Sequence, residues 1–319
     1  MGDTNMKPGL LAAYLVASFG AALCVAGPAY AQATGGTSQT ADEDAAEAAA
    51  LPAISADVVR ANSEVLAHPG GRIVGGEPVT IKDHPWQVAL IRGYLAEPQR
   101  SQFCGGSIIA DNWVLTAAHC VRNSVVREDA SRVNIIIGTE RYIAGGERIE
   151  VKSIHVHPKF DANTMDYDFT LLRLARPVTT GGAVTAKAIQ PAAANASLPA
   201  RTRSWVTGWG ATAEGGPGSL ELLGAQVPVV TNATCNKPQS YNGEITDRMI
   251  CAGKVQGGVD SCQGDSGGPL TATLAGSSTP SLIGVVSWGE GCARRLKYGI
   301  YARVSLAADW IASTMAANR

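Results

Sequence analysis

Three short stretches of the chain each carry a side chain whose type could take part in nucleophilic catalysis. His119 lies next to a cysteine, Asp168 begins an apolar run, and Ser266 lies in a glycine-rich turn. A serine hydroxyl is a strong nucleophile only when a base removes its proton, and histidine suits that task near neutral pH. A carboxylate orients the imidazole and stabilises its protonated form. Each residue alone is a weak signal, but the order His, Asp, Ser with these local sequences predicts nucleophilic catalysis.

The turn around Ser266 can also stabilise negative charge that develops on a substrate. Glycines before and after the serine remove the side chains that would crowd the backbone amides. We therefore expect the N–H groups of Gly264 and Ser266 to point at one spot and to form an oxyanion hole.

Short β-like segments bounded by turn residues follow one another from Ile73 onward. The clearest are residues 86–91, 106–110, 113–117, 133–138, 170–174, 205–208, 226–230, 282–287 and 299–304. Only residues 305–317 show helical spacing, which would place Leu306, Trp310, Ile311 and Met315 on one face. Many short strands with one terminal helix indicate an all-β fold built from barrels.

The charge of the 319-residue chain is unevenly distributed. Lys and Arg number 26 and Asp and Glu 27, for a net charge of −1. Residues 1–72 carry three basic and seven acidic side chains (net −4), whereas residues 73–319 carry 23 and 20 (net +3). A chain with so little net charge has no strong electrostatic attraction for a phosphate backbone, which argues against nucleic acid as a partner.

The first 72 residues have the features of processed segments. Residues 1–31 are predicted to be a signal peptide, because Lys7 precedes an apolar run and Ala29-Tyr30-Ala31 is a small-residue cleavage site. A membrane anchor is the alternative, but the apolar run is short for a span of about 20 residues. Residues 32–72 are acidic, and their Ala-rich part, residues 42–51, has too few large apolar side chains to form a core, so we interpret residues 32–72 as a propeptide, with a plain linker as the alternative.

Six cysteines remain once the signal peptide is removed, and they are Cys104, Cys120, Cys235, Cys251, Cys262 and Cys292. An even number in a secreted chain indicates disulfides, with 15 arrangements open. No Cys-x-x-Cys or Cys/His ligand spacing is present, so we expect neither a structural metal nor another cofactor.

The chain resembles the trypsin-like members of the chymotrypsin family of serine endopeptidases. The matching motifs run in family order and are Arg72-Ile73-Val74-Gly75-Gly76, Pro85-Trp86-Gln87-Val88, Cys104-Gly105-Gly106-Ser107, Thr116-Ala117-Ala118-His119-Cys120, Asp168-Phe169-Thr170-Leu171-Leu172, Thr207-Gly208-Trp209-Gly210, Cys251-Ala252-Gly253, Asp260-Ser261-Cys262-Gln263-Gly264-Asp265-Ser266-Gly267-Gly268-Pro269, Ser287-Trp288-Gly289 and Gly299-Ile300-Tyr301. The resemblance implies two packed six-stranded antiparallel β-barrels with a C-terminal helix and an active site between the barrels.

The resemblance assigns a role to each residue of the catalytic set. It implies Ser266 as nucleophile, His119 as general base and then acid, and Asp168 as the orienting carboxylate. Asp166 is the nearby alternative, and we prefer Asp168 because it directly precedes the apolar strand, as the family's aspartate does.

The resemblance further implies that residues 73–319 are a peptidase domain released by cleavage after Arg72. The new Ile73 ammonium would then pair with the Asp265 carboxylate next to Ser266. An unpaired buried charge is strongly unfavourable, so the uncut chain is expected to be an inactive zymogen.

The same resemblance places Asp260 at the floor of the primary specificity pocket, with Ser261 beside it. Gly289 and Gly299 would form the pocket walls, and an aspartate there predicts cleavage after Arg or Lys. Ser287, Trp288 and Gly289 would pair with the substrate backbone as an added strand.

The disulfides implied by the resemblance are Cys104–Cys120, Cys235–Cys251 and Cys262–Cys292. Residues 138–147, where many trypsins bind calcium, are shortened, and Thr139 replaces the first expected glutamate. Glu140 and Glu147 stay acidic, but we expect no calcium site of the family type.

These features predict a secreted serine endopeptidase, extracellular or periplasmic, that acts on polypeptides with Arg or Lys before the scissile bond. Protein protease inhibitors are expected partners; a nucleic acid, a stable membrane anchor or a stable oligomer is not expected. An inactive homologue that serves as a binding module is the alternative, but such proteins usually lose part of the catalytic set. An esterase is less favoured, since that class presents Gly-x-Ser-x-Gly in a strand–helix elbow.

Overall fold

The computed structural model describes residues 73–95, 101–122, 128–178, 185–194 and 196–318. The chain divides into a unit of Met1–His68 and a unit of Pro69–Arg319, and the fold below is that of the second unit. The predicted signal peptide and propeptide, including Arg72, lie outside the described residues.

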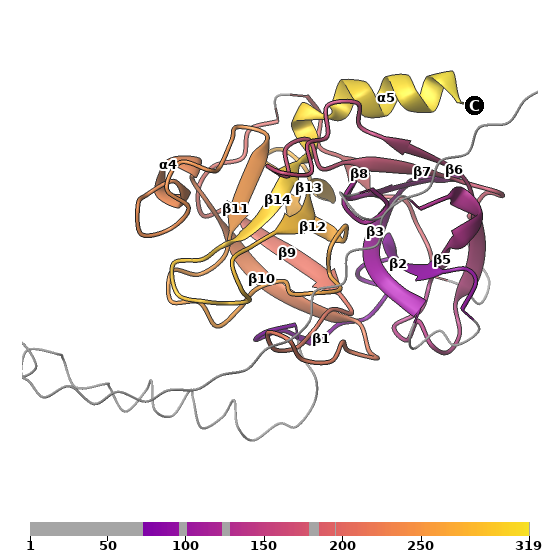
Figure 1. Cartoon of the computed structure of the whole chain (residues 1–319), viewed down its shortest axis with the longest axis horizontal. Coiled ribbons are helices and arrows are strands. Elements are labelled where there is room, and N and C mark those ends of the chain that lie inside the picture. The colour runs from indigo at the N-terminus through magenta and orange to yellow at the C-terminus, as the bar shows by residue number, and fades with distance from the viewer. Residues whose placement is uncertain (1–72, 96–100, 123–127, 179–184, 195, 319) are drawn as a thin grey trace, which may run out of the picture. The chain divides into compact units, whose positions relative to one another are not determined.

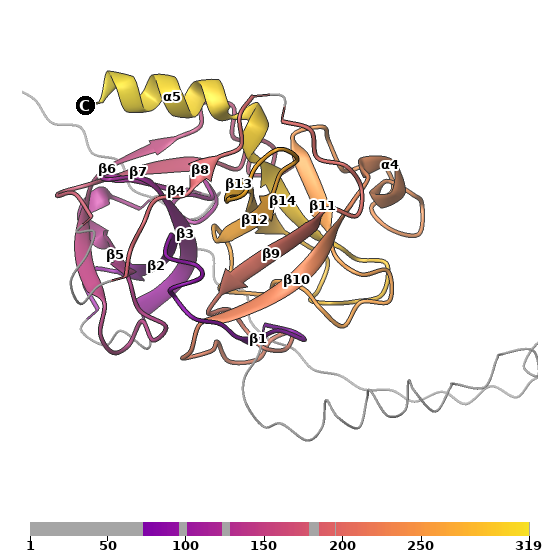
Figure 2. The same cartoon turned by 180° about the vertical axis from the view of Figure 1, so that it is seen from behind.

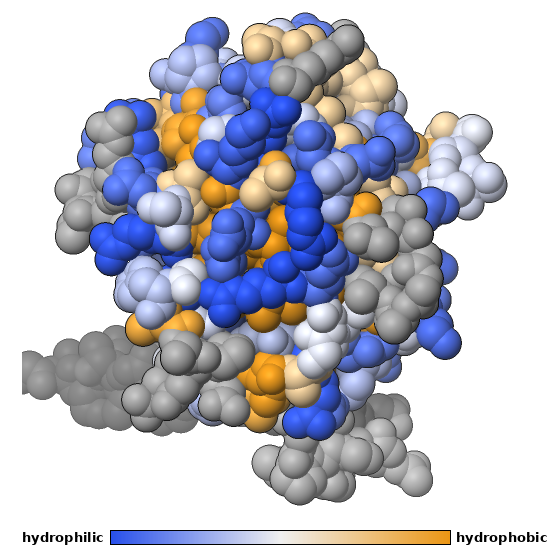
Figure 3. Space-filling view, turned by 90° about the vertical axis from the view of Figure 1, so that its right-hand side faces the viewer, coloured by the Kyte–Doolittle hydropathy of each residue, from blue (hydrophilic) through white to orange (hydrophobic). Residues whose placement is uncertain are grey.

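The first barrel closes from six antiparallel strands in the order β2-β3-β4-β7-β6-β5 (Figure 1). Their bounds are Gln87–Arg92 for β2, Gln102–Ala110 for β3, Trp113–Thr116 for β4, Val133–Ile137 for β5, Glu147–Val156 for β6 and Thr170–Leu174 for β7. Inward residues of these strands, such as Leu90, Ile135 and Leu171, are fully buried in one core. On β6 the buried Ile149 and Val151 alternate with exposed charged residues. Figure 3 shows this side of the molecule, where strongly hydrophilic side chains lie around exposed hydrophobic ones.

The second barrel closes from six antiparallel strands in the order β9-β10-β11-β14-β13-β12, with β12 returning to β9. Their bounds are Arg203–Gly208 for β9, Leu223–Val230 for β10, Met249–Ala252 for β11, Pro269–Thr273 for β12, Pro280–Trp288 for β13 and Gly299–Arg303 for β14. The short β1 (Glu77–Pro78) adds to β10, and β8 (Gln190–Pro191) pairs in parallel with β13. The fold is therefore the predicted pair of six-stranded barrels, which lie side by side in both views (Figures 1 and 2).

Helical structure is short in the described part of the chain. It comprises η1 (Ala130–Arg132), α4 (Asn232–Cys235), η2 (Val304–Leu306) and α5 (Ala308–Ala317). Figure 2 shows helix α5. Its Ile311 is buried in the same core as the first-barrel strands, with Trp310 and Met315 packed against that core. Leu306 was expected on that face but is 45% exposed, because it lies in the 3-10 turn η2 before α5 begins. No helix in these residues is long and apolar enough to cross a membrane.

Candidate active site

His119 and Asp168 meet at one edge of the first barrel. Strands β4 and β7 pair in register through Thr116 and Thr170, so the turn after β4 and the residue before β7 emerge together. The Nδ1 atom of His119 lies 2.7 Å from Asp168 Oδ2, and the His119 backbone N–H donates to Oδ1 at 2.9 Å. Asp168 is fully buried and the imidazole is 17% exposed. A carboxylate only accepts hydrogen bonds, so the ring nitrogen facing it carries the proton.

The second barrel supplies a third hydrogen bond to the same carboxylate. The Ser287 hydroxyl at the end of β13 donates to Asp168 Oδ2 at 2.5 Å. Sequence reasoning had assigned Ser287 only to the substrate-binding edge. The contact joins the two barrels at the carboxylate and fixes its orientation from both sides.

Asp166 has a different partner from Asp168. Its carboxylate accepts from Arg248 Nε at 2.7 and 2.9 Å and from the Thr246 hydroxyl at 3.1 Å. Of the two candidate carboxylates, the described contacts therefore place Asp168 on the imidazole and Asp166 in an ion pair with the second barrel.

Ser266 lies in a turn whose glycines have backbone angles that other residues rarely adopt. Gly264 has φ +96° and Gly267 has φ +80°, and a Cβ on Gly267 would lie 2.2 Å from the Thr116 hydroxyl oxygen. The Ser266 carbonyl accepts from the Gly105 N–H at 2.7 Å, which fastens the turn to β3 next to the disulfide beside His119. Within the described residues, the N–H groups of Gly264 and Ser266 have no backbone acceptor.

The Gly264 carbonyl is held by a residue that the sequence analysis missed. Gln102 on β3 donates from Nε2 to this carbonyl at 2.9 Å and to the Cys104 carbonyl at 3.1 Å. Holding the carbonyl on one side of the peptide unit orients the turn that carries Ser266. No motif in the sequence marks Gln102, because its role depends on how the two barrels meet.

Asp265 is fully buried behind the same turn. Its carboxylate accepts from the Gly210 N–H at 2.8 Å and the Cys262 N–H at 3.0 Å, and burial raises its pKa to about 6. Within the described residues, no cationic side chain pairs with it. The Ile73 side chain is fully buried in the second-barrel core.

A cavity of about 180 Å³ opens beside Ser266. Its lining includes Asp260, Ser261, Ser266, Ser287, Trp288, Gly289 and Gly299. These are residues that the sequence analysis assigned to the nucleophile and to substrate binding. The structure therefore brings the predicted nucleophile and the predicted specificity residues to one site.

Asp260 is the buried acid of this cavity. It is 4% exposed and accepts from the Ser261 N–H at 2.8 Å and the Ala293 N–H at 3.2 Å. Burial raises its pKa to about 7, although the two backbone N–H groups oppose the shift. A Cβ on Gly299 would lie 2.6 Å from Asp260 Oδ1, so a larger residue there would close the cavity onto its acid.

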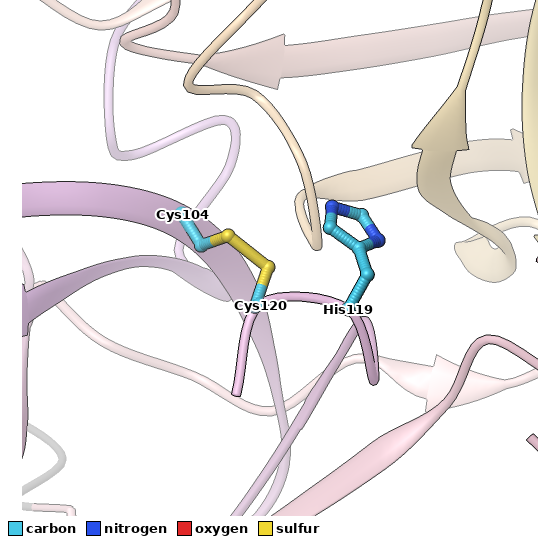
Figure 4. A group of neighbouring side chains, drawn as sticks. All are labelled: Cys104, His119 and Cys120. Atoms are coloured by element: carbon cyan, nitrogen blue, oxygen red, sulfur yellow. A yellow bond between two sulfur atoms is a disulfide. The ribbon is translucent and has the colours of Figure 1, made fainter. Parts of the chain in front are cut away.

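The described residues form the three disulfides that the resemblance implies: Cys104–Cys120 beside His119, Cys262–Cys292 in the cavity lining, and Cys235–Cys251 between α4 and β11. Cys104, His119 and Cys120 bring possible metal-ligand atoms within 4.8 Å of one another. The two sulfurs are bonded to each other, and Figure 4 shows the His119 ring pointing away from them. A metal ligand would be a thiolate, so this group does not fit a metal ion.

The loop from 138 to 147 does not fit a calcium ion either. Glu140 accepts from the Ile81 N–H at 3.0 Å and the Thr80 hydroxyl at 3.2 Å, and the Ile81 bond lowers its pKa. Glu147 forms an ion pair with Arg176. The Thr139 hydroxyl accepts from the Arg141 N–H at 3.0 Å and lies 3.2 Å from the Ala144 carbonyl. Glu140, Glu147 and Thr139 thus each have a protein partner on at least one side-chain oxygen.

We therefore expect thermal stability to be independent of calcium. A bound ion at 100 times its Kd would add about 2.7 kcal/mol, or roughly 5–10 °C in Tm for a domain of this size. Scanning calorimetry in millimolar EDTA and in millimolar calcium should give the same Tm. Arg176→Gln should lower Tm by roughly 2–4 °C through loss of the Glu147 pair, whereas the exposed Arg141→Gln in the same loop should not. A Tm that falls in EDTA would contradict this assignment.

Comparisons with known proteins agree with the geometry. The trypsin family model matches residues 73–311. Trypsin 5G1 of Aedes aegypti is 40% identical over 241 residues, which cover 76% of this chain and 84% of that protein. The anionic trypsins of Canis lupus familiaris and Bos taurus are 38% and 39% identical over 249 residues, which cover 77% of this chain and 91% of each relative.

Proposed function

The chain belongs to the trypsin family of serine endopeptidases, and we propose that it cleaves polypeptides after Arg or Lys through a Ser266–His119–Asp168 triad. One observation carries the proposal: the Asp168–His119 hydrogen bond lies at the barrel edge to which the Ser266 turn is fastened. The same turn borders the cavity whose buried acid is Asp260.

The protons move along the triad in two steps. Asp168 holds the proton on His119 Nδ1, so Nε2 carries the lone pair that accepts the Ser266 proton as Oγ attacks the substrate carbonyl. The imidazolium then gives that proton to the departing amine, which leaves an ester on Ser266. Water then attacks the ester carbonyl carbon as His119 takes its proton. The bond from that carbon to Ser266 Oγ breaks, the carboxylic acid product leaves, and Ser266 recovers the proton from His119. The Asp168 carboxylate stays ionised and stabilises the imidazolium in both steps.

The negative charge on the tetrahedral oxygen is the second requirement. The N–H groups of Gly264 and Ser266 would donate to it, and neither has a backbone acceptor within the described residues. The Gln263 carbonyl, in the peptide unit that carries the Gly264 N–H, accepts from the Ala211 N–H at 2.6 Å, and Gln102 holds the next carbonyl, that of Gly264. Donors fixed before the reaction stabilise the transition state without reorganising.

Activation is the third part of the proposal. Cleavage after Arg72 would free an Ile73 ammonium, and a cation beside Asp265 would favour the ionised carboxylate, whose pKa burial raises to about 6. Gly210 and Cys262 already orient that carboxylate next to Ser266. In this proposal residues 1–31 direct secretion, residues 32–72 form the propeptide and residues 73–319 act as a monomeric peptidase that protein inhibitors can block.

Asp260→Ser tests the specificity. We expect kcat/KM for an Arg ester to fall about 10³-fold, because the substrate cation would enter a buried site without its counter-ion. In the unaltered enzyme, KM for that ester should rise as pH falls below about 7, since protonation neutralises Asp260. Asp265, Tyr241 and Tyr301 are the titratable groups that face Asp260. The measurement is the steady-state rate on Arg and Phe esters after activation.

The matched control for this test is Asp111→Ser, which removes an exposed carboxylate in the turn between β3 and β4. Its steady-state rates on the Arg and Phe esters should equal those of the unaltered enzyme. Equal hydrolysis of the Arg ester by Asp260→Ser and the unaltered enzyme would refute the assignment of Asp260.

A further inference from the structure

Glu214 connects two loops at the mouth of the specificity cavity. It lies on the loop after β9, and its carboxylate accepts from Arg294 Nη2 at 2.6 Å and Arg294 Nε at 2.9 Å. The same carboxylate lies 3.4 Å from the backbone nitrogen of Cys292, on the opposite side of Ala293. One glutamate therefore holds the segment of residues 292–294 at two points.

Ala293, the residue between these two points, has an unfavourable backbone conformation. Its φ is +55°, in the left-handed region that a residue with a Cβ rarely adopts. Its carbonyl accepts from the Gly258 N–H at 2.8 Å. A Cβ on Gly257 would lie 2.2 Å from that carbonyl oxygen, so the segment is closely packed from this side. Such a conformation persists only when its surroundings hold it in place.

The strained residue makes a contact with the floor of the cavity. The Ala293 N–H donates to Asp260 Oδ2 at 3.2 Å, and the Ser261 N–H occupies the other carboxylate oxygen at 2.8 Å. These two bonds favour the ionised carboxylate against the effect of burial. An unbroken series of contacts thus leads from Glu214 through residues 292–294 to Asp260.

We propose that Glu214 is a positioning residue for substrate specificity, which fixes the Ala293 N–H against the Asp260 carboxylate by holding Cys292 and Arg294. The inference rests on the proposed role of Asp260 in binding a cationic side chain. Glu214 itself does not line the cavity, so its effect reaches the substrate only through this backbone segment. Without Glu214, the segment can relax out of the left-handed conformation and withdraw one hydrogen bond from Asp260.

The expected effect of removing the Glu214 carboxylate depends on how exposed its ion pair with Arg294 is. The Glu214 and Arg294 side chains are 42% and 54% exposed, and exposed ion pairs contribute little. We therefore expect Glu214→Ala to weaken binding of benzamidinium, a planar cation, about two- to fivefold, and to raise KM for an Arg ester by a similar factor. The value of kcat should change less than twofold, since the triad makes no contact with this segment.

The pH profile separates positioning from general loss of structure. Loss of the Ala293 N–H should move the acidic limb of benzamidinium binding to higher pH, because Asp260 would ionise less readily. Glu214→Gln should show an intermediate defect, since its amide oxygen can still accept from Cys292. Glu150→Ala, which removes an exposed carboxylate on β6, is the matched control and should match the unaltered enzyme.

Relief of the backbone strain provides an independent test. Glycine adopts φ +55° readily, so Ala293→Gly should make Glu214→Ala less harmful than it is in the unaltered background. The inference is overturned if Glu214→Ala leaves the benzamidinium Ki and its pH profile unchanged while Asp260→Ser abolishes binding. If Asp260→Ser also leaves binding unchanged, the proposed specificity fails instead.

Discussion

Ser266→Ala is expected to lower kcat by about 10⁶-fold while the protein keeps its fold. The change removes one oxygen from a half-buried side chain, and the bonds that fasten the turn use the Ser266 carbonyl, which alanine retains. The unaltered protein and Ser266→Ala should both be activated by an added trypsin that is then removed. The initial rate on an Arg peptide and the Tm measure the two parts of this prediction.

Ser277→Ala is the matched control, because it removes an exposed hydroxyl that bonds only within its own turn. It should retain full activity. A fluorophosphonate should label Ser266 in the control and nothing at that position in Ser266→Ala. Residual activity above about 1% in Ser266→Ala would refute the nucleophile assignment.

The same variant reveals how the chain is activated. The residue before the predicted cleavage site is Arg72, which fits the proposed specificity. If the enzyme processes itself, the unaltered protein should begin at Ile73 and Ser266→Ala should keep its propeptide when both are made without added protease. Ile73 at the start of both proteins would require another protease.

The barrels could be predicted because strands with one buried face leave a regular pattern in the sequence. All nine segments that were expected to be extended lie on strands. Three barrel strands, β6, β11 and β12, were not among them. In β6 the exposed charged residues that alternate with Ile149 and Val151 lower the average hydrophobicity of the segment. Leu306 was placed on the helix face because periodicity does not distinguish a 3-10 turn from the helix that follows it.

Each catalytic residue that was predicted from the sequence lies in a short, recognisable motif. His119, Asp168 and Ser266 each lie in a distinctive local sequence. By contrast, Gln102 and Glu214 act across long sequence separations on backbone groups of other loops. Their roles depend on how loops meet in space, and no local pattern of residue types encodes that. Ser287 was predicted as a substrate-binding residue, but its hydrogen bond to Asp168 was not predicted, because it joins residues of different barrels.

Asp168→Asn should lower kcat by about 10⁴-fold, and the structure gives the reason. The Asp168 carboxylate accepts from the His119 backbone N–H through one oxygen and faces His119 Nδ1 with the other. An asparagine would keep its oxygen on the backbone N–H and present its amide N–H₂ to Nδ1. The imidazole must then carry its proton on Nε2, where it cannot accept the proton of Ser266.

Asp166→Asn is the matched control, because it makes the same chemical change two residues earlier. It weakens the Arg248 pair, in which the side chains are 33% and 16% exposed, so we expect a loss of about 1 kcal/mol in stability. Activity should stay within about threefold of the unaltered enzyme. Rates on an Arg peptide and unfolding in urea, measured for both variants, separate the two roles. A large loss of kcat in Asp166→Asn with little change in Asp168→Asn would reverse the assignment of the orienting carboxylate.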